Sequence, residues 1–329
     1  MRERRAVACR INGIGDMDNK KSSHNLIGIF FVSVCALVWG FAFLAQRSAS
    51  SDVPVFTFNG FRFALAVVTI GIMILINKPI DKKRGVSRPG WNKSTFIGGT
   101  FCGICLFIAN NLQQYGIART SLGKAGFITA LYIVIVPLLS VLIRKRITTH
   151  SWIAVALGIV GFYLMCMDDG ASLSFNEADY ILLICAIGFS MQIIFIDVYV
   201  GDTDPFKLTF VQFLVAAVLS LPVMAIEGFA PIEAIRDNIW SILYVGIFSA
   251  GIGFTFQTIG QKYTTPELAT LIMSMESVIA LIAGVAILHE PCSTTEFIGC
   301  MVVMLAVFIA QFYVPHKMLR PNYSKYFVE

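Results

Sequence analysis

Two residues of opposite charge lie inside long apolar stretches of the sequence, where an ionised side chain is costly. Glu276 sits near the middle of the run from Thr265 to Glu290, and Arg62 lies within an earlier run. A charge at the centre of a bilayer costs about 2.5–3.5 kcal/mol or more. If each run crosses a ~30 Å apolar layer as a helix, the two residues reach nearly the same depth. Both side chains should therefore face a protein interior or a water-filled cavity.

The Glu276 carboxyl group can be interpreted in two ways. As a functional group it would face the cavity, and bind a substrate amine or exchange a proton. As a structural group it would pair with Arg62 or form hydrogen bonds with its neighbours Ser274 and Ser277. The sequence leaves both interpretations open.

The apolar runs also contain carboxamides and large aromatic residues. The carboxamides are Asn110, Asn111, Gln113, Gln114, Gln257 and Gln261. Neutral amides both donate and accept hydrogen bonds, which suits zwitterionic or polar substrates. The alternative is a set of hydrogen bonds between helices, each contributing about 0.6 kcal/mol. Trp39 and Tyr132 are candidates for an apolar wall of the same cavity, with packing between helices as the alternative.

Catalytic and metal chemistry have little support in the sequence. The four histidines lie at the ends of the apolar runs or outside them, and no H-E-x-x-H, paired-acid or Walker A motif occurs. Cys102 and Cys105 form a C-x-x-C without a partner pair, so we interpret them as packing residues. We expect no cofactor, no metal and no enzymatic activity.

The composition predicts an all-α integral membrane protein. Of the 329 residues, 57% are hydrophobic and 14% are charged, which is too little charge to cover a soluble surface. Ten apolar runs are each long enough to cross a bilayer. They cover residues 26–46, 54–76, 95–116, 121–143, 150–168, 178–199, 206–226, 239–261, 265–288 and 294–313. Asp204 and Thr265, each followed by proline, are predicted to cap helices.

Positive charges alternate between the loops. The N-terminal segment and the 77–94 loop contain six lysines and arginines each, whereas the opposite set of loops has only Arg47, Arg119, Lys124 and Arg236. By the positive-inside rule, both termini are predicted to be cytoplasmic. Residues 1–25 would then form a basic cytoplasmic segment, with Met17 as an alternative start, and 314–329 a cytoplasmic tail. The basic residues lie in short segments between apolar runs, which does not indicate nucleic-acid binding.

The two halves of the chain resemble each other. The recurring patterns are Thr57-Phe58-x-x-Phe61 with Thr209-Phe210-x-x-Phe213, Gln113-x-x-Gly116 with Gln257-x-x-Gly260, and Ala125-x-x-Ile128 with Ala269-x-x-Ile272. Because five crossings are an odd number, the second copy must enter the membrane from the opposite side. The sequence therefore predicts two inverted five-helix repeats, 26–168 and 178–313, with a substrate site between them near the midplane.

Several of these residues also carry a resemblance to a known family. They are Trp39-Gly40, Arg62-Phe63, the run from Gly126 to Tyr132, Pro137, Glu276-Ser277 and Glu290. In this order, over about 26–313, the chain resembles the EamA-type transporters of the drug/metabolite transporter superfamily. The resemblance implies ten helices in two repeats, and export or exchange of small metabolites such as amino acids. The sequence departs from the family pattern at His289, where glycine usually precedes the glutamate.

We therefore expect a secondary transporter in the cell membrane that exports small polar metabolites by alternating access, with proton coupling through Glu276 as a further hypothesis. Its expected partners are a small-molecule substrate and membrane lipid. The alternatives are an integral membrane enzyme and a sensor. The first would need clustered ligands or a nucleophile with its base at membrane depth, and the second usually carries a soluble output domain.

Overall fold

The computed structural model describes residues 2–142, 149–165, 167 and 176–312, and its regular elements are helices. The first half contains α1 (Arg2–Ala49), α2 (Val55–Arg84), α3 (Lys93–Ile117), α4 (Leu122–Thr129), α5 (Tyr132–Leu142) and α6 (Thr149–Met165). The second half contains α7 (Glu177–Tyr199), α8 (Pro205–Glu227), α9 (Ile232–Asp237), α10 (Ile239–Leu243), the π-helix η1 (Tyr244–Gly253), α11 (Phe254–Tyr263), α12 (Pro266–Met273), α13 (Met275–Ile287) and α14 (Thr294–Phe312). The predicted tail, 314–329, lies outside the described residues.

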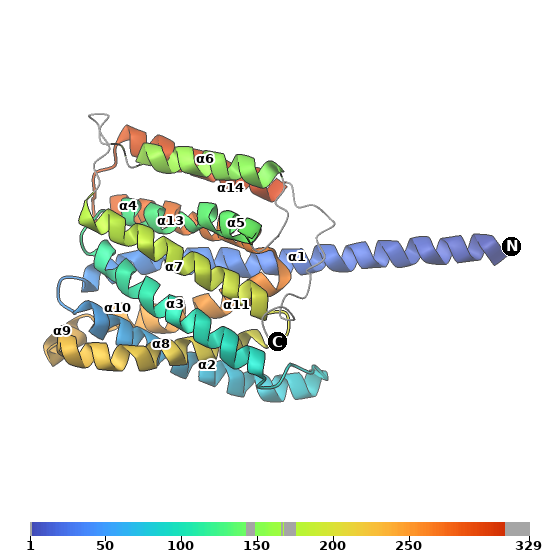
Figure 1. The fold of residues 1–329 in the computed structure, drawn as a ribbon, viewed down its shortest axis with the longest axis horizontal. Coiled ribbons are helices and arrows are strands. Elements are labelled where there is room, and N and C mark those ends of the chain that lie inside the picture. The colour runs from blue at the N-terminus through green and yellow to red at the C-terminus, as the bar shows by residue number, and fades with distance from the viewer. Residues whose placement is uncertain (1, 143–148, 166, 168–175, 313–329) are drawn as a thin grey trace.

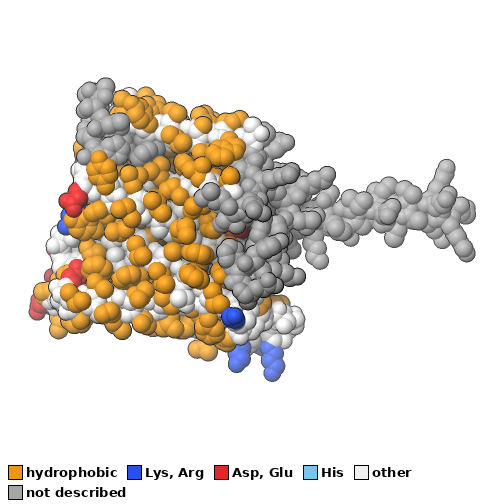
Figure 2. Space-filling model, viewed as in Figure 1, with side chains coloured by type: hydrophobic (Ala, Val, Ile, Leu, Met, Phe, Trp, Pro, Cys, Tyr) orange, Lys and Arg blue, Asp and Glu red, His pale blue; other side chains and the backbone are white. Residues whose placement is uncertain are grey.

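Eight helical stretches of the described chain are long and apolar enough to cross a membrane. Three of them combine consecutive helices, namely α4 with α5, α10 with η1 and α11, and α12 with α13. The predicted fifth and tenth spans correspond to α6 and α14, whose apolar segments are shorter, at Trp152–Gly161 and Thr294–Ala306. The structure thus supports a multi-pass membrane protein, and the count of ten crossings remains a prediction. Figure 2 shows apolar side chains over most of the visible face of the bundle.

The helices of the two halves are intercalated. In Figure 1, α1 and α7, the first helices of the two halves, run in opposite directions. α1 packs against η1, α11, α12 and α13 of the second half, and α3 packs against α7 and α8. α6 and α14 form a pair along one edge of the bundle (Figure 1). The central helices therefore meet where the sequence predicts a site between repeats.

Sequence-encoded caps and one glycine position these helices. The Asp204 side chain accepts a hydrogen bond from the Phe206 N–H at 2.9 Å, and Thr265 accepts one from the Leu268 N–H at 3.3 Å. Both predicted caps are confirmed. At Gly103 on α3, an added Cβ would lie 2.6 Å from the Gln212 carbonyl oxygen, so only glycine allows α3 and α8 to approach this closely.

Two of the predicted continuous spans are interrupted in their middle. α4 ends at Thr129 before α5 begins at Tyr132, and α12 ends at Met273 before α13 begins at Met275. The two breaks are 144 residues apart, which is the offset between the repeated patterns that begin at Gln113 and Gln257. Discontinuous helices of this kind are typical of transporter binding sites, because a break turns polar groups toward a cavity.

Candidate functional site

A cavity lies where the broken helices meet α1, α2, α3, α7, η1 and α11, with about 380 Å³ of empty space when the solvent at its opening is included. It is lined by Trp39, Ala42, Phe43, Gln46, Arg62, Gln113, Thr129, Tyr132, Phe189, Ile193, Ser249, Phe254, Gln257 and Glu276. Six of the nine residues predicted as site candidates line it, and the predicted Asn110, Asn111 and Gln114 do not. Both halves of the chain supply walls, so the site belongs to neither repeat alone.

The Glu276 carboxylate accepts a hydrogen bond from the Tyr132 hydroxyl, with 2.8 Å between the oxygens. Tyr132 and Glu276 are 144 residues apart, so they occupy equivalent positions in the two halves and each follows the break in its own span. Gln113 and Gln257, which share this offset, both line the cavity as well. The repeat therefore places one matched pair of residues in direct contact at its centre.

The neighbouring serines do not bind the Glu276 side chain. Ser274 donates its hydroxyl to the Leu271 carbonyl at 2.8 Å, and Ser277 donates to the Ser274 carbonyl at 2.6 Å. These bonds satisfy the last carbonyls of α12 at the break. The structural interpretation in which serines satisfy Glu276 is therefore wrong for this structure.

Arg62 reaches the cavity from α2 and is held by neutral groups. Its terminal nitrogens donate to the Gln46 Oε1 at 3.2 Å and to the Ser249 hydroxyl at 3.3 Å. Its Nε has no hydrogen-bond partner, although the residue is only 2% exposed. Among the described residues, no nitrogen–oxygen distance of 4.0 Å or less joins Arg62 to Glu276, so they do not form the direct ion pair of the structural interpretation. The cavity thus contains an acidic and a basic side chain that do not contact each other directly.

Two predicted amides, Asn111 and Gln114, bind neighbouring helices and do not line the cavity, and the Asn110 side chain donates to the Leu106 carbonyl of its own helix at 3.0 Å. Asn59, which the sequence analysis did not select, donates to the Asn110 carbonyl at 3.1 Å and to the Asn111 Oδ1 at 3.0 Å. Gln114 donates to the Gln46 carbonyl at 3.1 Å. For Asn111 and Gln114 the structure agrees with the alternative of hydrogen bonding between helices. Successive helix residues point about 100° apart, so Gln113 and Gln114 cannot both face one cavity.

Gln257 lies in a network of amides at one side of the cavity. It exchanges two hydrogen bonds of 3.2 Å with Gln192 on α7, and Gln192 also donates to the Gln212 Oε1 at 3.3 Å. Gln261 donates to the Ile193 carbonyl at 3.2 Å and does not line the cavity. Gln192 was missed because its isolated position in an apolar run gave no indication of its partner.

Aromatic rings form the apolar part of the wall. The Trp39 indole N–H donates to the Ser249 carbonyl at 3.1 Å, and its ring lies 4.5 Å from that of Phe254, centroid to centroid. Ser249 therefore fixes both Trp39 and Arg62. It lies in η1, and π-helical turns frequently occur at functional sites because they displace backbone groups from the regular hydrogen-bond pattern.

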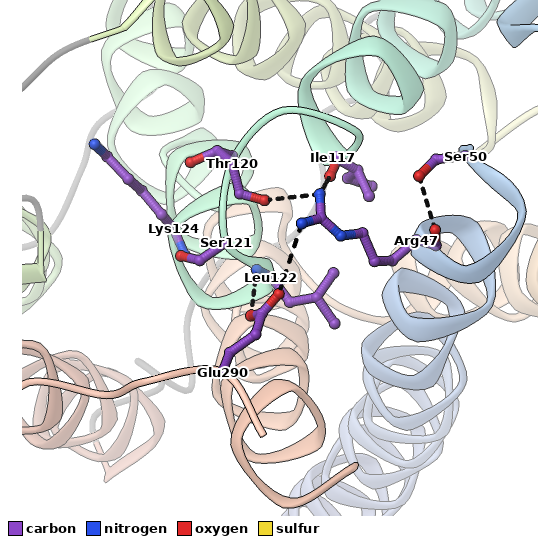
Figure 3. Close-up of polar contacts among 8 residues, drawn as sticks. All are labelled: Arg47, Ser50, Ile117, Thr120, Ser121, Leu122, Lys124 and Glu290. Atoms are coloured by element: carbon purple, nitrogen blue, oxygen red, sulfur yellow. Dashed lines mark hydrogen bonds and ion pairs between the residues drawn. The ribbon is translucent and has the colours of Figure 1, made fainter. Parts of the chain in front are cut away.

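A second polar cluster joins the ends of three helices beyond the cavity (Figure 3). Arg47, at the end of α1, donates to the Ile117 carbonyl at 2.5 Å and to the Thr120 carbonyl at 3.2 Å. The Glu290 carboxylate accepts the Leu122 N–H at 2.9 Å and lies 4.0 Å from the Arg47 guanidinium. We call Arg47, Glu290 and the 117–122 turn the end cluster. On α1 it follows directly after the cavity residue Gln46.

The end cluster holds the turn after α13 against the start of α4. Glu290 is not a freely solvated side chain, because only 17% of it is exposed. His289 has a φ of 56°, in the left-handed region that favours glycine. This conformation explains why the family usually has glycine there, and it aims Glu290 back at α4. Nearby, Lys124 forms an ion pair of 2.9 Å with the buried Asp179, which the sequence analysis did not predict.

Substitutions of Glu290 should separate its hydrogen bond from its charge. Glu290→Gln keeps an acceptor for the Leu122 N–H and loses only a partly exposed ion pair at 4.0 Å, which contributes about 0–1 kcal/mol. Glu290→Ala leaves that N–H without its partner and should lower the free energy of unfolding by about 1–3 kcal/mol. Unfolding midpoints of the purified protein in detergent would check this order. The matched control is Glu233→Ala on the exposed helix α9; an equal loss there, or in Glu290→Gln, would contradict the prediction.

Comparisons with known proteins agree on one family. Residues 26–167 and 177–312 each match the EamA-like transporter family. A protein named "Uncharacterized transporter" from Archaeoglobus fulgidus is 30% identical over 279 residues, covering 84% of this chain and 83% of the relative. "Uncharacterized transporter YoaV" of Bacillus subtilis is 21% identical over 295 residues, covering 87% and 96%. One crystal structure, 19% identical, superposes with a TM-score of 0.67 over 88% of this chain and 97% of that one, which shows a shared fold.

Proposed function

Because the chain belongs to the EamA-like transporter family and is a membrane transporter, we propose that it carries small zwitterionic metabolites, amino acids and related compounds, by alternating access. Export from the cytoplasm is the proposed direction. We also propose that both termini lie on the cytoplasmic side, on the basis of the lysines and arginines of the loops. The ten crossings are proposed to form two inverted repeats, for which the opposite directions of α1 and α7 are the support (Figure 1).

One observation carries the substrate proposal: Glu276 and Arg62 line the same cavity without forming an ion pair with each other. A zwitterion would satisfy both, with its ammonium at Glu276 and its carboxylate at Arg62. Arg62 Nε is buried at the cavity and has no hydrogen-bond partner, so the carboxylate would find a donor that the protein leaves unused. Buried polar groups without partners are costly, which favours occupation by a ligand.

The remaining walls suit a small organic molecule. Trp39 and Phe254 offer an apolar face for a substrate side chain, and Gln113 and Gln257 offer donors and acceptors from the two halves. Proton exchange at Glu276, with Tyr132 as its hydrogen-bond partner, is the proposed coupling step. The end cluster joins the end of α1, the α3–α4 turn and the end of α13, which lie on the outer side if the N-terminus is cytoplasmic. We propose that these contacts break when the cavity opens to that side.

Counterflow in proteoliposomes tests the proposal. Vesicles loaded with one unlabelled compound are placed in a trace of the same labelled compound, and the panel holds amino acids, the corresponding amines without a carboxylate, and the corresponding acids without an amine. We expect accumulation of zwitterions, with at most weak accumulation of the other two classes. Equal exchange of amines or acids would contradict a two-charge site, and no exchange of any zwitterion would reject this substrate class.

A further inference from the structure

α2 extends farther than a membrane crossing requires, and its end forms one corner of the bundle. α2 has 30 residues, and at 1.5 Å per residue it is about 45 Å long, more than a ~30 Å hydrocarbon layer requires. Gly85 ends it with a φ of 65° and donates its N–H to the Asp81 and Lys82 carbonyls. The last turns of α2 therefore continue into the region of the lipid headgroups.

These last turns and the start of α3 present a group of exposed cations, which we call the basic corner: Lys78, Lys82, Lys83, Arg84 and Lys93. The only acid between residues 77 and 94 is Asp81. Asp81 is paired with Arg88, whose Nη2 lies 3.1 Å from the Asp81 Oδ1 and whose Nε contacts the Oδ2. Figure 2 shows blue side chains beside this end of α2, next to the apolar band. The five cations are therefore not offset by an acid of their own segment.

The loop beside the basic corner is fixed to α8 and α3. Lys207 donates to the Pro89 carbonyl at 2.6 Å, and its ammonium lies 5.7 Å from the Trp91 ring. Arg88 lies 5.0 Å from the ring of Phe206. Asn92 caps α3 through the Thr95 N–H at 2.8 Å. Because these contacts hold the loop in place, a ligand bound here would not need to order it first.

The corner also has an apolar edge at the level where acyl chains begin. Leu75 and Ile76 lie about one turn before Lys78 and about two turns before Lys82, and they are 70% and 56% exposed. Trp91 is 49% exposed and stacks on Phe96 with 5.8 Å between centroids. Tryptophan at this level is typical of the membrane interface. Cations above an exposed apolar edge match a molecule with a phosphate group and acyl chains.

We propose that the basic corner binds the headgroup of an anionic phospholipid. The phosphate lies among Lys78, Lys82 and Lys83, and the acyl chains lie along Leu75 and Ile76. Charge complementarity selects the anionic headgroup over a zwitterionic one, since each cation near a charged membrane surface strengthens binding about fivefold. This site is separate from the cavity and does not depend on the transported substrate.

Quenching of Trp91 fluorescence tests the proposal on the full-length protein. The protein is reconstituted in phosphatidylcholine vesicles with increasing fractions of phosphatidylglycerol, and either lipid carries the brominated acyl chains that quench tryptophan. The contribution of Trp91 is the difference from Trp91→Phe. We expect brominated phosphatidylglycerol to quench Trp91 at a several-fold lower mole fraction than brominated phosphatidylcholine. Equal quenching by the two lipids would overturn the proposal.

Matched charge-removing variants supply the second arm. Lys82→Gln with Lys83→Gln should raise the fraction of phosphatidylglycerol needed for half-quenching about tenfold or more. The control, Arg119→Gln with Arg236→Gln, removes the same charge at the opposite end and should leave that fraction unchanged. An equal rise in both variants would overturn the proposal, because it would indicate a general effect of net charge. Displacement of the lipid by millimolar inorganic phosphate would assign the site to a soluble anion and would also overturn it.

Discussion

Replacing Glu276 with glutamine should reduce the initial rate of zwitterion counterflow about 10- to 150-fold. The amide preserves the shape of the side chain and still accepts from the Tyr132 hydroxyl, but it loses the charge that would hold a substrate ammonium. A hydrogen bond to a charged group contributes about 1.5–3 kcal/mol, which corresponds to this range of rates. Initial rates in proteoliposomes, normalised to the amount of inserted protein, would measure the effect.

Two further variants serve as comparisons for Glu276→Gln. Glu233→Gln changes an exposed acid of α9, outside the cavity, and should leave counterflow unchanged. Tyr132→Phe removes the hydroxyl from Glu276 while the carboxylate keeps its charge, so a reduction smaller than that of Glu276→Gln is expected. Unchanged transport in Glu276→Gln, with normal insertion, would exclude this acid from the transport cycle.

Replacing Arg62 with lysine should reduce counterflow of carboxylate-bearing substrates about 10- to 100-fold. The guanidinium spans Gln46 and Ser249 with two nitrogens and still has Nε available to the cavity. The lysine ammonium keeps the charge, but it is a single point and cannot reproduce this planar arrangement. The lost bidentate contact to the carboxylate accounts for the expected reduction. Rates for an amino acid and for its decarboxylated amine, measured side by side, would test it.

The comparison between the two substrates separates binding from structure. If Arg62 binds the carboxylate, the lysine variant transports the amino acid more slowly, while the weak transport of the amine is unchanged. A loss of both in equal proportion would assign Arg62 a structural role in holding Gln46 and Ser249. Arg236→Lys is the matched control, because the Arg236 side chain is 73% exposed and does not line the cavity. This variant should transport both substrates as the unchanged chain does.

Much of the site could be predicted from the sequence because charge in an apolar run is informative. Glu276 and Arg62 are costly at membrane depth unless they face a polar space, and the structure places both at one cavity. The cost of a polar side chain at membrane depth predicted the positions of the amides less well. A neutral amide is satisfied by a single neighbouring carbonyl, as Gln114 is by Gln46, so its presence alone does not distinguish a site from a helix contact.

Which side of each helix packs against protein, and which contacts lipid, could not be predicted from the periodicity of the sequence. In a soluble protein the polar face of a helix is exposed to water, so the opposite face can be recognised as the buried one. Here both the lipid and the neighbouring helices are apolar, so this distinction is lost. The runs therefore gave the length and depth of each span, but not which side of it packs against protein. The breaks at Thr129 and Met273 were likewise missed, since neither contains a glycine or proline to mark it.

The sequence by itself determined that the chain is a multi-pass membrane protein with two related halves, and which positions of the halves correspond, because length, hydropathy and residue offset are properties of the chain alone. Only the tertiary structure decided that the equivalent residues Tyr132 and Glu276 touch, that Arg62 is held by Gln46 and Ser249, and that Glu290 reaches Leu122. These partners come from different helices, and their directions depend on how each helix is rotated in the packed bundle. That rotation is set by contacts between residues far apart in the chain, such as the close approach of Gly103 to the backbone carbonyl of Gln212.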